Sequence, residues 1–166
     1  MNDLFGIQSR AGCSCAGPYG HILLDIDDKT SNKFRSQILK GCEGIKPGWV
    51  RVNIHYTLSQ EDIDYLLEAI TFVARFGYLF LQKYKFDMRT AEWKHIGFEE
   101  TIPEFSLDND FAPKSVKLED LPRLRESYLD QAGAIASELE KQGEMPFVQD
   151  EKDIEELKSF DYIHRA

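Results

Sequence analysis

The stretch Gly48-Trp-Val-Arg-Val-Asn-Ile-His55 decides the fold class, because its apolar and polar side chains alternate at the period of a β-strand. One face of this strand would carry the aliphatic side chains, which are Val50, Val52 and Ile54. The other face would carry a polar row, which is Arg51, Asn53 and His55. An apolar strand face needs an element that covers it, so we expect a helix to pack nearby.

The sequence directly after this strand predicts such a helix. Ser59-Gln-Glu-Asp62 is a helix start, with Ser59 as the cap and Asp62 in the position usually taken by Glu. Between Ile63 and Ala74, apolar side chains recur at helical spacing and form one stripe. We expect this helix to run to about Leu81 and to be the main packing element of the sheet.

Further elements are predicted on both sides of this pair. Before the strand we expect a short strand at 5–10, a loop at 12–20, a helical turn at 21–26 and a helix at 31–40 capped by Thr30 or Ser31. After the long helix we expect a hairpin of 84–86 and 92–95, irregular chain at 97–116, a long helix at 118–142 and an amphipathic helix at 150–160. The acidic residues at 150–156 are interpreted as the solvated face of the last helix.

These elements predict an α/β fold of the α+β kind, with a small, mostly antiparallel sheet and helices on one face. The length of 166 residues suits one domain. We assign residues 1–96 to a small domain and residues 97–166 to a helical C-terminal extension packed on the same domain.

The composition argues against several classes of function. A net charge of −9 argues against binding to nucleic acid and to anionic membrane surfaces. No apolar run reaches the roughly 18 residues of a membrane span. The N-terminus lacks the basic start and apolar core of a signal peptide. We therefore expect a cytoplasmic protein with no membrane partner.

The cysteines favour neither a disulfide framework nor a metal site. They are Cys13, Cys15 and Cys42, an odd number without an export signal. Cys13 and Cys15 are too close in sequence to bridge comfortably. As zinc ligands they form an incomplete pair, and adding His21 and Cys42 gives a spacing that fits no common zinc pattern.

The loop from Ser9 to His21 is the first candidate for chemistry. Its small residues allow the backbone to approach a ligand closely. A cysteine in such a loop is exposed enough to react, and Arg10 or a helix N-terminus would lower the pKa of its thiol. The alternative interpretation is a glycine-rich turn with incidental buried cysteines.

Arg51 is the second candidate, because it lies in mid-strand between apolar neighbours. A buried arginine is costly unless an anion meets it, and its planar fork suits bidentate binding of a carboxylate. The alternative is that the Arg51 face is simply solvated. His55 is interpreted as a surface or packing residue, and Tyr84 and Trp93 as packing residues of the hairpin.

These two candidate regions resemble one known family. Phe5-Gly-Ile-Gln-Ser-Arg-Ala-Gly-Cys-Ser-Cys-Ala-Gly-Pro18 resembles the motif R-[ST]-G-x-x-C-A-x-P in the C-terminal domain of cysteine desulfurases and selenocysteine lyases. Gly44-Ile-Lys-Pro-Gly-Trp-Val-Arg-Val52, followed by the helix start at Ser59, resembles the next strand and helix of that domain. The resemblance covers about residues 2–95, and residues 100–166 have no counterpart in it.

The resemblance implies the small domain of a fold-type-I enzyme of the class V aminotransferase type, which uses pyridoxal 5'-phosphate (PLP) on an amino acid. In such enzymes the large domain holds the cofactor and the small domain closes over the substrate. Carried over by position, Arg51 would bind the substrate α-carboxylate, Arg10 would line the same site, and Cys15 would attack the substrate sulfur. Two departures weaken the case for desulfurase chemistry: Ala11 replaces Ser or Thr, and Cys13-Ser14 replaces a His pair.

The same resemblance implies that half of the enzyme is missing. The Schiff-base lysine of the family follows a His in the large domain, and Lys94-His95 has the opposite order. We therefore expect an incomplete chain that is inactive and binds no PLP alone, with three partners: the large domain, an amino-acid substrate and a second copy in a homodimer. Two alternatives stay open, a non-catalytic sulfur-carrier or interaction module and a structural remnant.

Overall fold

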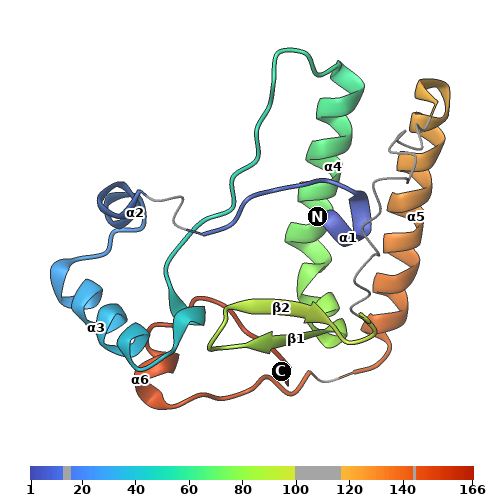
Figure 1. Cartoon of the computed structure of the whole chain (residues 1–166). Coiled ribbons are helices and arrows are strands. Elements are labelled where there is room, and N and C mark those ends of the chain that lie inside the picture. Colours follow the sequence, from blue (N-terminus) through green and yellow to red (C-terminus); the bar gives the residue numbers. More distant parts are fainter. Residues whose placement is uncertain (13–15, 100–116, 144) are drawn as a thin grey trace, which may run out of the picture.

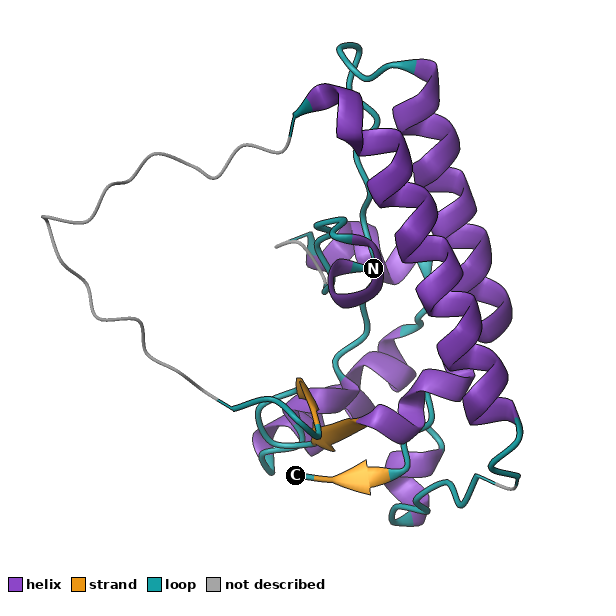
Figure 2. Ribbon diagram, turned by 90° about the vertical axis from the view of Figure 1, so that its right-hand side faces the viewer, coloured by secondary structure: helices purple, strands orange, loops and turns teal. Residues whose placement is uncertain are grey.

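The computed structural model describes residues 1–12, 16–99, 117–143 and 145–166 (Figures 1 and 2). The α-helices are α1 (Asn2–Phe5), α2 (Gly17–Leu23), α3 (Asp28–Leu39), α4 (Gln60–Phe76), α5 (Leu121–Glu140) and α6 (Lys152–Glu155). The strands are β1 (Tyr84–Asp87), β2 (Glu92–His95) and β3 (His164–Arg165). Short 3-10 helices lie at Glu43–Ile45, Gly77–Lys83 and Leu118–Asp120. The predicted α+β class is confirmed. Within these ranges, no helix is both long and apolar enough to cross a bilayer.

Helices α4 and α5 pack side by side and build the main apolar core (Figure 2). Small side chains allow the close approach, because Ala69 of α4 and Ala132 of α5 are both fully buried. Phe5 of α1 packs with these alanines, and its ring meets the ring of Phe72 edge-on at 5.5 Å. The Tyr65 hydroxyl donates to the Phe5 carbonyl at 2.8 Å, which fixes α1 between the two long helices (Figure 1).

The strands form one small mixed sheet in the order β2-β1-β3. β1 and β2 are the predicted antiparallel hairpin, with Phe86 paired to Trp93. β3 comes from the C-terminal end of the chain and pairs in parallel with β1, which the sequence pattern did not predict. Phe86 is buried at the centre of the sheet, and its ring contacts the rings of Phe160 and Tyr162 at 4.9 and 5.2 Å.

The long helix begins where the sequence predicts. The Asp62 N–H donates to the Ser59 hydroxyl at 3.2 Å, and the Ser59 N–H donates to the Asp62 carboxylate at 2.8 Å. Both halves of the predicted capping box are therefore present. The helix ends at Phe76 rather than Leu81, because the next turn tightens into a 3-10 helix whose apolar side chains pack against α5.

The helix predicted at 31–40 is confirmed as α3, with an earlier start. Its cap is Asp27 rather than Thr30 or Ser31, and the Asp27 carboxylate accepts a hydrogen bond from the Thr30 N–H at 2.7 Å. α2 likewise begins earlier than the helical turn predicted at 21–26. The start of α3 is therefore set by a capping side chain that apolar spacing does not reveal, whereas α2 begins without a side-chain cap.

Two predicted strands are not formed as strands. At 5–10, the chain instead completes α1, which Gly6 ends with a left-handed φ of 62°. At 49–55, Arg51 is the only residue assigned a β-bridge, and its partner is Arg10. The two segments meet in a single isolated β-bridge, so within the described structure neither forms a β-ladder.

The helix predicted at 150–160 is also wrong, because α6 covers only four of its residues, Lys152–Glu155. Lys158 and Asp150 turn inward, with side chains only 3% and 8% exposed, and pair at 3.3 Å. Glu155 also pairs with Lys158, at 2.7 Å. The interpretation of this acidic stretch as a solvated face therefore holds for Glu151, Asp153 and Glu156, which are exposed, and is wrong for Asp150, whose carboxylate is buried in the ion pair with Lys158.

Candidate functional site

The structure brings together the two arginines that were predicted as site residues. The Arg51 N–H donates to the Arg10 carbonyl at 2.8 Å, and the Arg10 N–H donates to the Arg51 carbonyl at 3.3 Å. One step along, the Trp49 N–H donates to the Gly12 carbonyl at 3.2 Å. The two segments on which the family resemblance was predicted therefore run antiparallel and in direct contact.

Two glycines allow this contact. A Cβ atom on Gly48 would lie 2.8 Å from the carbonyl carbon of Gly12 and 2.9 Å from its Cα. Gly12 itself has a φ of +105°, which residues with side chains rarely adopt. The glycines of the two motifs thus have one shared structural role, which is to let two backbones touch beside the arginines.

Trp49 holds helix α2 beside the backbone contact between Gly12 and Gly48. A Cβ atom on Gly20 would lie 2.9 Å from the Trp49 ring, so the helix backbone lies directly on the indole. The Tyr19 ring meets Trp49 edge-on at 6.1 Å. His21 uses its Nδ1–H to donate to the Gly17 carbonyl at 2.8 Å, within its own helix. This contact engages His21 locally and does not direct it toward a metal.

The predicted catalytic residue, Cys15, lies outside the described residues together with Cys13. Its reactivity therefore stays a prediction. The chain on both sides of it is placed, since Gly12 and α2 each contact Trp49. Cys42 is a half-buried free thiol. Among the residues that the structure describes, no group of three or more His, Cys, Asp or Glu side chains is arranged to hold a metal.

Charge is the distinctive feature of the Arg10–Arg51 bridge. Both residues are exposed, and within the described ranges neither guanidinium has a hydrogen-bond or ion-pair partner. Residues directly opposite on antiparallel strands point their side chains to the same face, with Cβ atoms about 4.5–5.5 Å apart. Two like charges so placed repel, and an anion that binds both relieves the repulsion. Arg51 is thus solvated, but it shares its face with a second cation.

His55 lies outside this arrangement. Its Nδ1 accepts hydrogen bonds from the Thr57 hydroxyl at 2.8 Å and from the Thr57 N–H at 3.3 Å. Its ring also lies 4.3 Å from the Tyr56 ring. These contacts hold His55 on the surface of the turn that precedes α4, in line with its interpretation as a surface residue.

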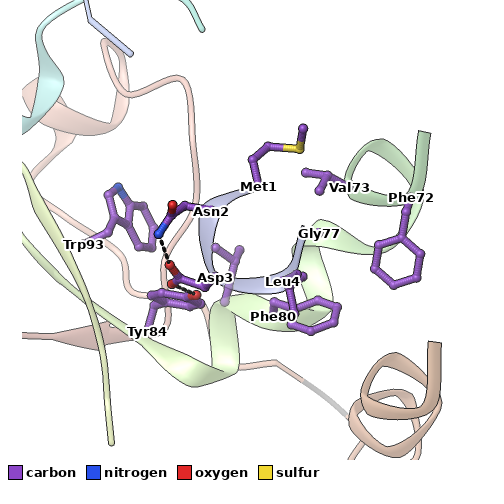
Figure 3. Close-up of a pocket in the computed structure, with 11 residues that line it drawn as sticks. Met1, Asn2, Asp3, Leu4, Phe72, Val73, Gly77, Phe80, Tyr84 and Trp93 are labelled. Atoms are coloured by element: carbon purple, nitrogen blue, oxygen red, sulfur yellow. Dashed lines mark hydrogen bonds between the residues drawn. The ribbon is translucent and has the colours of Figure 1, made fainter. Parts of the chain in front are cut away.

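A cavity of about 270 Å³ that sequence reasoning missed lies between α1, the end of α4 and the hairpin (Figure 3). At its polar end the Tyr84 hydroxyl donates to Asp3 at 2.5 Å, and Asn2 donates to the same carboxylate at 3.2 Å. These hydrogen bonds lower the pKa of Asp3, while burial and the bond to Asp3 raise the pKa of Tyr84. No sequence pattern links residues so far apart in the chain.

A second polar contact joins the starts of the two long helices. Arg125 of α5 forms an ion pair with Asp62 of α4 and lies over the Tyr65 ring, 5.2 Å from its centroid. The hydrogen bond from Arg125 is the main reason that the pKa of Asp62 is lowered. This arginine already has a carboxylate partner, in contrast to Arg10 and Arg51, so its role is to join α4 and α5.

Comparison with protein-family models, with curated proteins and with solved structures gives no match for this chain. The functional interpretation therefore depends on the residues themselves, above all on the bridge between Arg10 and Arg51.

Proposed function

We propose that this chain is the C-terminal small domain of a PLP-dependent enzyme of the class V aminotransferase and cysteine desulfurase type, which acts on an amino acid. One observation carries the proposal: the backbone bridge that puts Arg10 and Arg51 side by side on one exposed face. Arg51 binds the α-carboxylate of the substrate through its planar fork. Arg10 lines the same site and adds a second positive charge.

The exposure of this face fits a domain that works against a partner. A single carboxylate in water gains little from two exposed guanidinium groups, because the high dielectric screens the attraction. Closure of a second domain over the site excludes water and strengthens the same interaction. In this proposal the large domain supplies that cover, and the small domain supplies the carboxylate-binding face.

PLP stabilises the negative charge that develops on the substrate α-carbon, and we propose that the large domain holds it. Three lysines of this chain are engaged in ion pairs, which are Lys158, Lys46 and Lys33. Hydrogen bonds to Glu155 and Asp150 outweigh burial and raise the pKa of Lys158, whereas a Schiff-base amine needs a lowered pKa. Lys46 is ion-paired with Glu43 and Lys33 with Glu156. In this proposal the Schiff-base lysine belongs to the large domain, and no step of the cofactor chemistry is assigned to this chain.

Cys15 is the proposed sulfur acceptor. Its thiolate attacks the sulfur of a cysteine substrate, a sulfur–sulfur bond forms, and the carbon–sulfur bond breaks. The electron pair of the broken bond stays with the substrate carbon, which takes up a proton. In the sequence, Cys15 lies between Gly12 and α2, and both of these contact Trp49. This step is separable from carboxylate binding by Arg51.

A PLP titration of the purified chain, followed by addition of L-cysteine and an assay for alanine, tests whether PLP binding and turnover require the large domain. We expect no Schiff-base absorbance, no adduct that borohydride traps and no alanine. A saturable, borohydride-trapped adduct with turnover would mean that a lysine of this chain does the chemistry. That result would overturn the assignment as a small domain without its cofactor site.

A further inference from the structure

The cavity between α1, the end of α4 and the hairpin has two chemically different ends (Figure 3). Most of its wall is apolar and is formed by Leu4, Phe72, Val73, Phe80 and Leu81. Its polar side chains gather at the other end, where the Asp3 carboxylate accepts hydrogen bonds from Asn2 and Tyr84. Apolar walls with a few polar groups that orient the ligand are typical of small-molecule sites.

The groups at the polar end are held in place by their own contacts. The Tyr84 hydroxyl donates to one oxygen of the Asp3 carboxylate at 2.5 Å, and the Asn2 amide donates to the other at 3.2 Å. Figure 3 shows Trp93 on the same side of the cavity as Asp3. The Trp93 ring packs against the buried ring of Phe86, with centroids 4.7 Å apart. A ligand at this end therefore meets a carboxylate and an aromatic ring in fixed positions.

The Asp3 carboxylate has both charge and hydrogen-bonding capacity to offer. Hydrogen bonds from Tyr84 and Asn2 lower its pKa, so it is ionised at neutral pH. The amino group of Met1 and the ring of His95 lower the pKa further, but among the described residues neither is hydrogen-bonded or ion-paired to Asp3. Each carboxylate oxygen has two lone pairs and accepts one hydrogen bond here, so each can accept a second one.

These features favour an ammonium group over other ligand groups. A compact ammonium can donate to an oxygen that already accepts one hydrogen bond, whereas the guanidinium fork binds both carboxylate oxygens at once. An ammonium is also attracted to the face of a tryptophan ring such as Trp93. An anion would be repelled by Asp3. A water molecule takes about 30 Å³ in the liquid, so the cavity of about 270 Å³ has room for roughly nine non-hydrogen atoms.

We propose that this cavity binds a small primary amine with an apolar body, its ammonium group on Asp3 beside Trp93 and its body among the apolar side chains of the wall. Burial of the body supplies most of the affinity, because Asp3 is exposed and water screens its attraction for a cation. The carboxylate supplies the preference for an amine over a neutral molecule of the same shape. The cavity includes neither Arg10 nor Arg51, so this site is independent of the proposed function.

An NMR titration of the unmodified chain tests the site with two probes of the same shape. Phenethylammonium fits the size of the cavity, and phenethyl alcohol is its neutral counterpart. We expect the Trp93 indole N–H and the methyl groups of Leu4 and Val73 to shift saturably with phenethylammonium, with a dissociation constant on the order of 1 mM. The alcohol should bind roughly three- to fivefold more weakly, because it lacks the charge. The indole N–H of Trp49, which is not part of the cavity wall, should not shift.

A matched pair of variants assigns the preference to Asp3. Asp3→Asn keeps the shape of the side chain and removes its charge, so it should bind the amine and the alcohol about equally. Asp28→Asn, at an exposed position of α3, changes the net charge by the same amount and should keep the preference for the amine. Equal binding of the two probes by the unmodified chain, cavity signals that do not saturate with phenethylammonium, or an equal shift at Trp49 would overturn the proposal.

Discussion

At the residue scale, the backbone contact between Gly12 and Gly48 leaves no room for a side chain beside the Arg10–Arg51 bridge. We predict that Gly48→Ala lowers the free energy of unfolding by about 1–3 kcal/mol, because its Cβ would be pushed into backbone that has no freedom to rotate away. Gly133→Ala is the matched control. No atom lies within 4 Å of a Cβ at this position of α5, so alanine should stabilise the helix by about 0.5–1 kcal/mol. Urea unfolding that gives both variants the same sign would refute the close approach.

The Asp3–Tyr84 hydrogen bond predicts a specific pH dependence. Hydrogen bonds from Tyr84 and Asn2 lower the pKa of Asp3 in the folded chain below its ordinary value of 3.8. The ionised Asp3 carboxylate therefore stabilises the fold at pH values above its ordinary pKa of 3.8. This stabilisation is lost as the pH falls through the lowered pKa of the folded chain. Tyr84→Phe removes the larger of the two hydrogen bonds.

We expect the pKa of Asp3, followed by NMR, to rise toward 3.8 in Tyr84→Phe. Asp27 is the internal control, because its pKa is lowered by hydrogen bonds from Thr30, far from Tyr84. An Asp3 pKa that does not move, or a shift of equal size at Asp27, would contradict the assigned contact.

At the element scale, α4 depends on its capping box. Ser59→Ala removes the hydroxyl that accepts the Asp62 N–H and should lower the free energy of unfolding by about 1 kcal/mol. Ser36→Ala, at an exposed position inside α3, is the control and should be neutral or slightly stabilising, because alanine is the better helix former. Thermal unfolding in which Ser36→Ala costs as much as Ser59→Ala would argue against the cap.

The elements that were predictable are those with a local signal. The start of α4 follows from Ser59 and Asp62, which contact each other across a single helical turn. The hairpin follows from a turn in which the Asp87 carboxylate accepts from the Arg89 N–H at 2.7 Å. The helix predicted at 150–160 failed because Lys158 and Asp150 form a buried tertiary contact. Side-chain periodicity does not record which polar residues will meet inside the fold.

At the scale of the whole molecule, the C-terminal segment is held by the network around Asp150. Its carboxylate accepts hydrogen bonds from Lys158, from the Tyr162 hydroxyl at 2.7 Å and from Arg165 at 2.9 Å. Asp150→Ala leaves Lys158 buried with less compensation, so the free energy of unfolding should fall by about 3 kcal/mol. Asp161→Ala, at an exposed position, should change it by less than about 0.5 kcal/mol. Denaturant unfolding that does not separate the two variants would mean that the network is not holding the segment.

The candidate site was predictable only in part, because its contacts form between distant parts of the chain and leave no local signal in the sequence. The resemblance to the PLP enzymes singled out Arg10 and Arg51 one by one, and the alternation around Arg51 suggested a half-exposed strand. The direct backbone contact between them depends on the close approach of Gly12 and Gly48, which is a property of the folded chain. The Asp3–Tyr84 pair was missed altogether, because neither residue carries a local signal of the contact.

The most direct test of the central claim is an NMR titration of the arginine Nε–H signals with acetate, which mimics a substrate carboxylate, and with acetamide, its neutral counterpart. We expect the signals of Arg10 and Arg51 to shift with acetate and not with acetamide, because the bridge gathers two unpaired guanidinium groups on one face. Saturation should need a high acetate concentration, because this face is open to water in the isolated chain. The signal of Arg75, an exposed arginine of α4, should stay in place. If Arg51 does not respond, or if Arg75 responds equally, the Arg10–Arg51 bridge is not a carboxylate-binding site and the proposed function loses its main support.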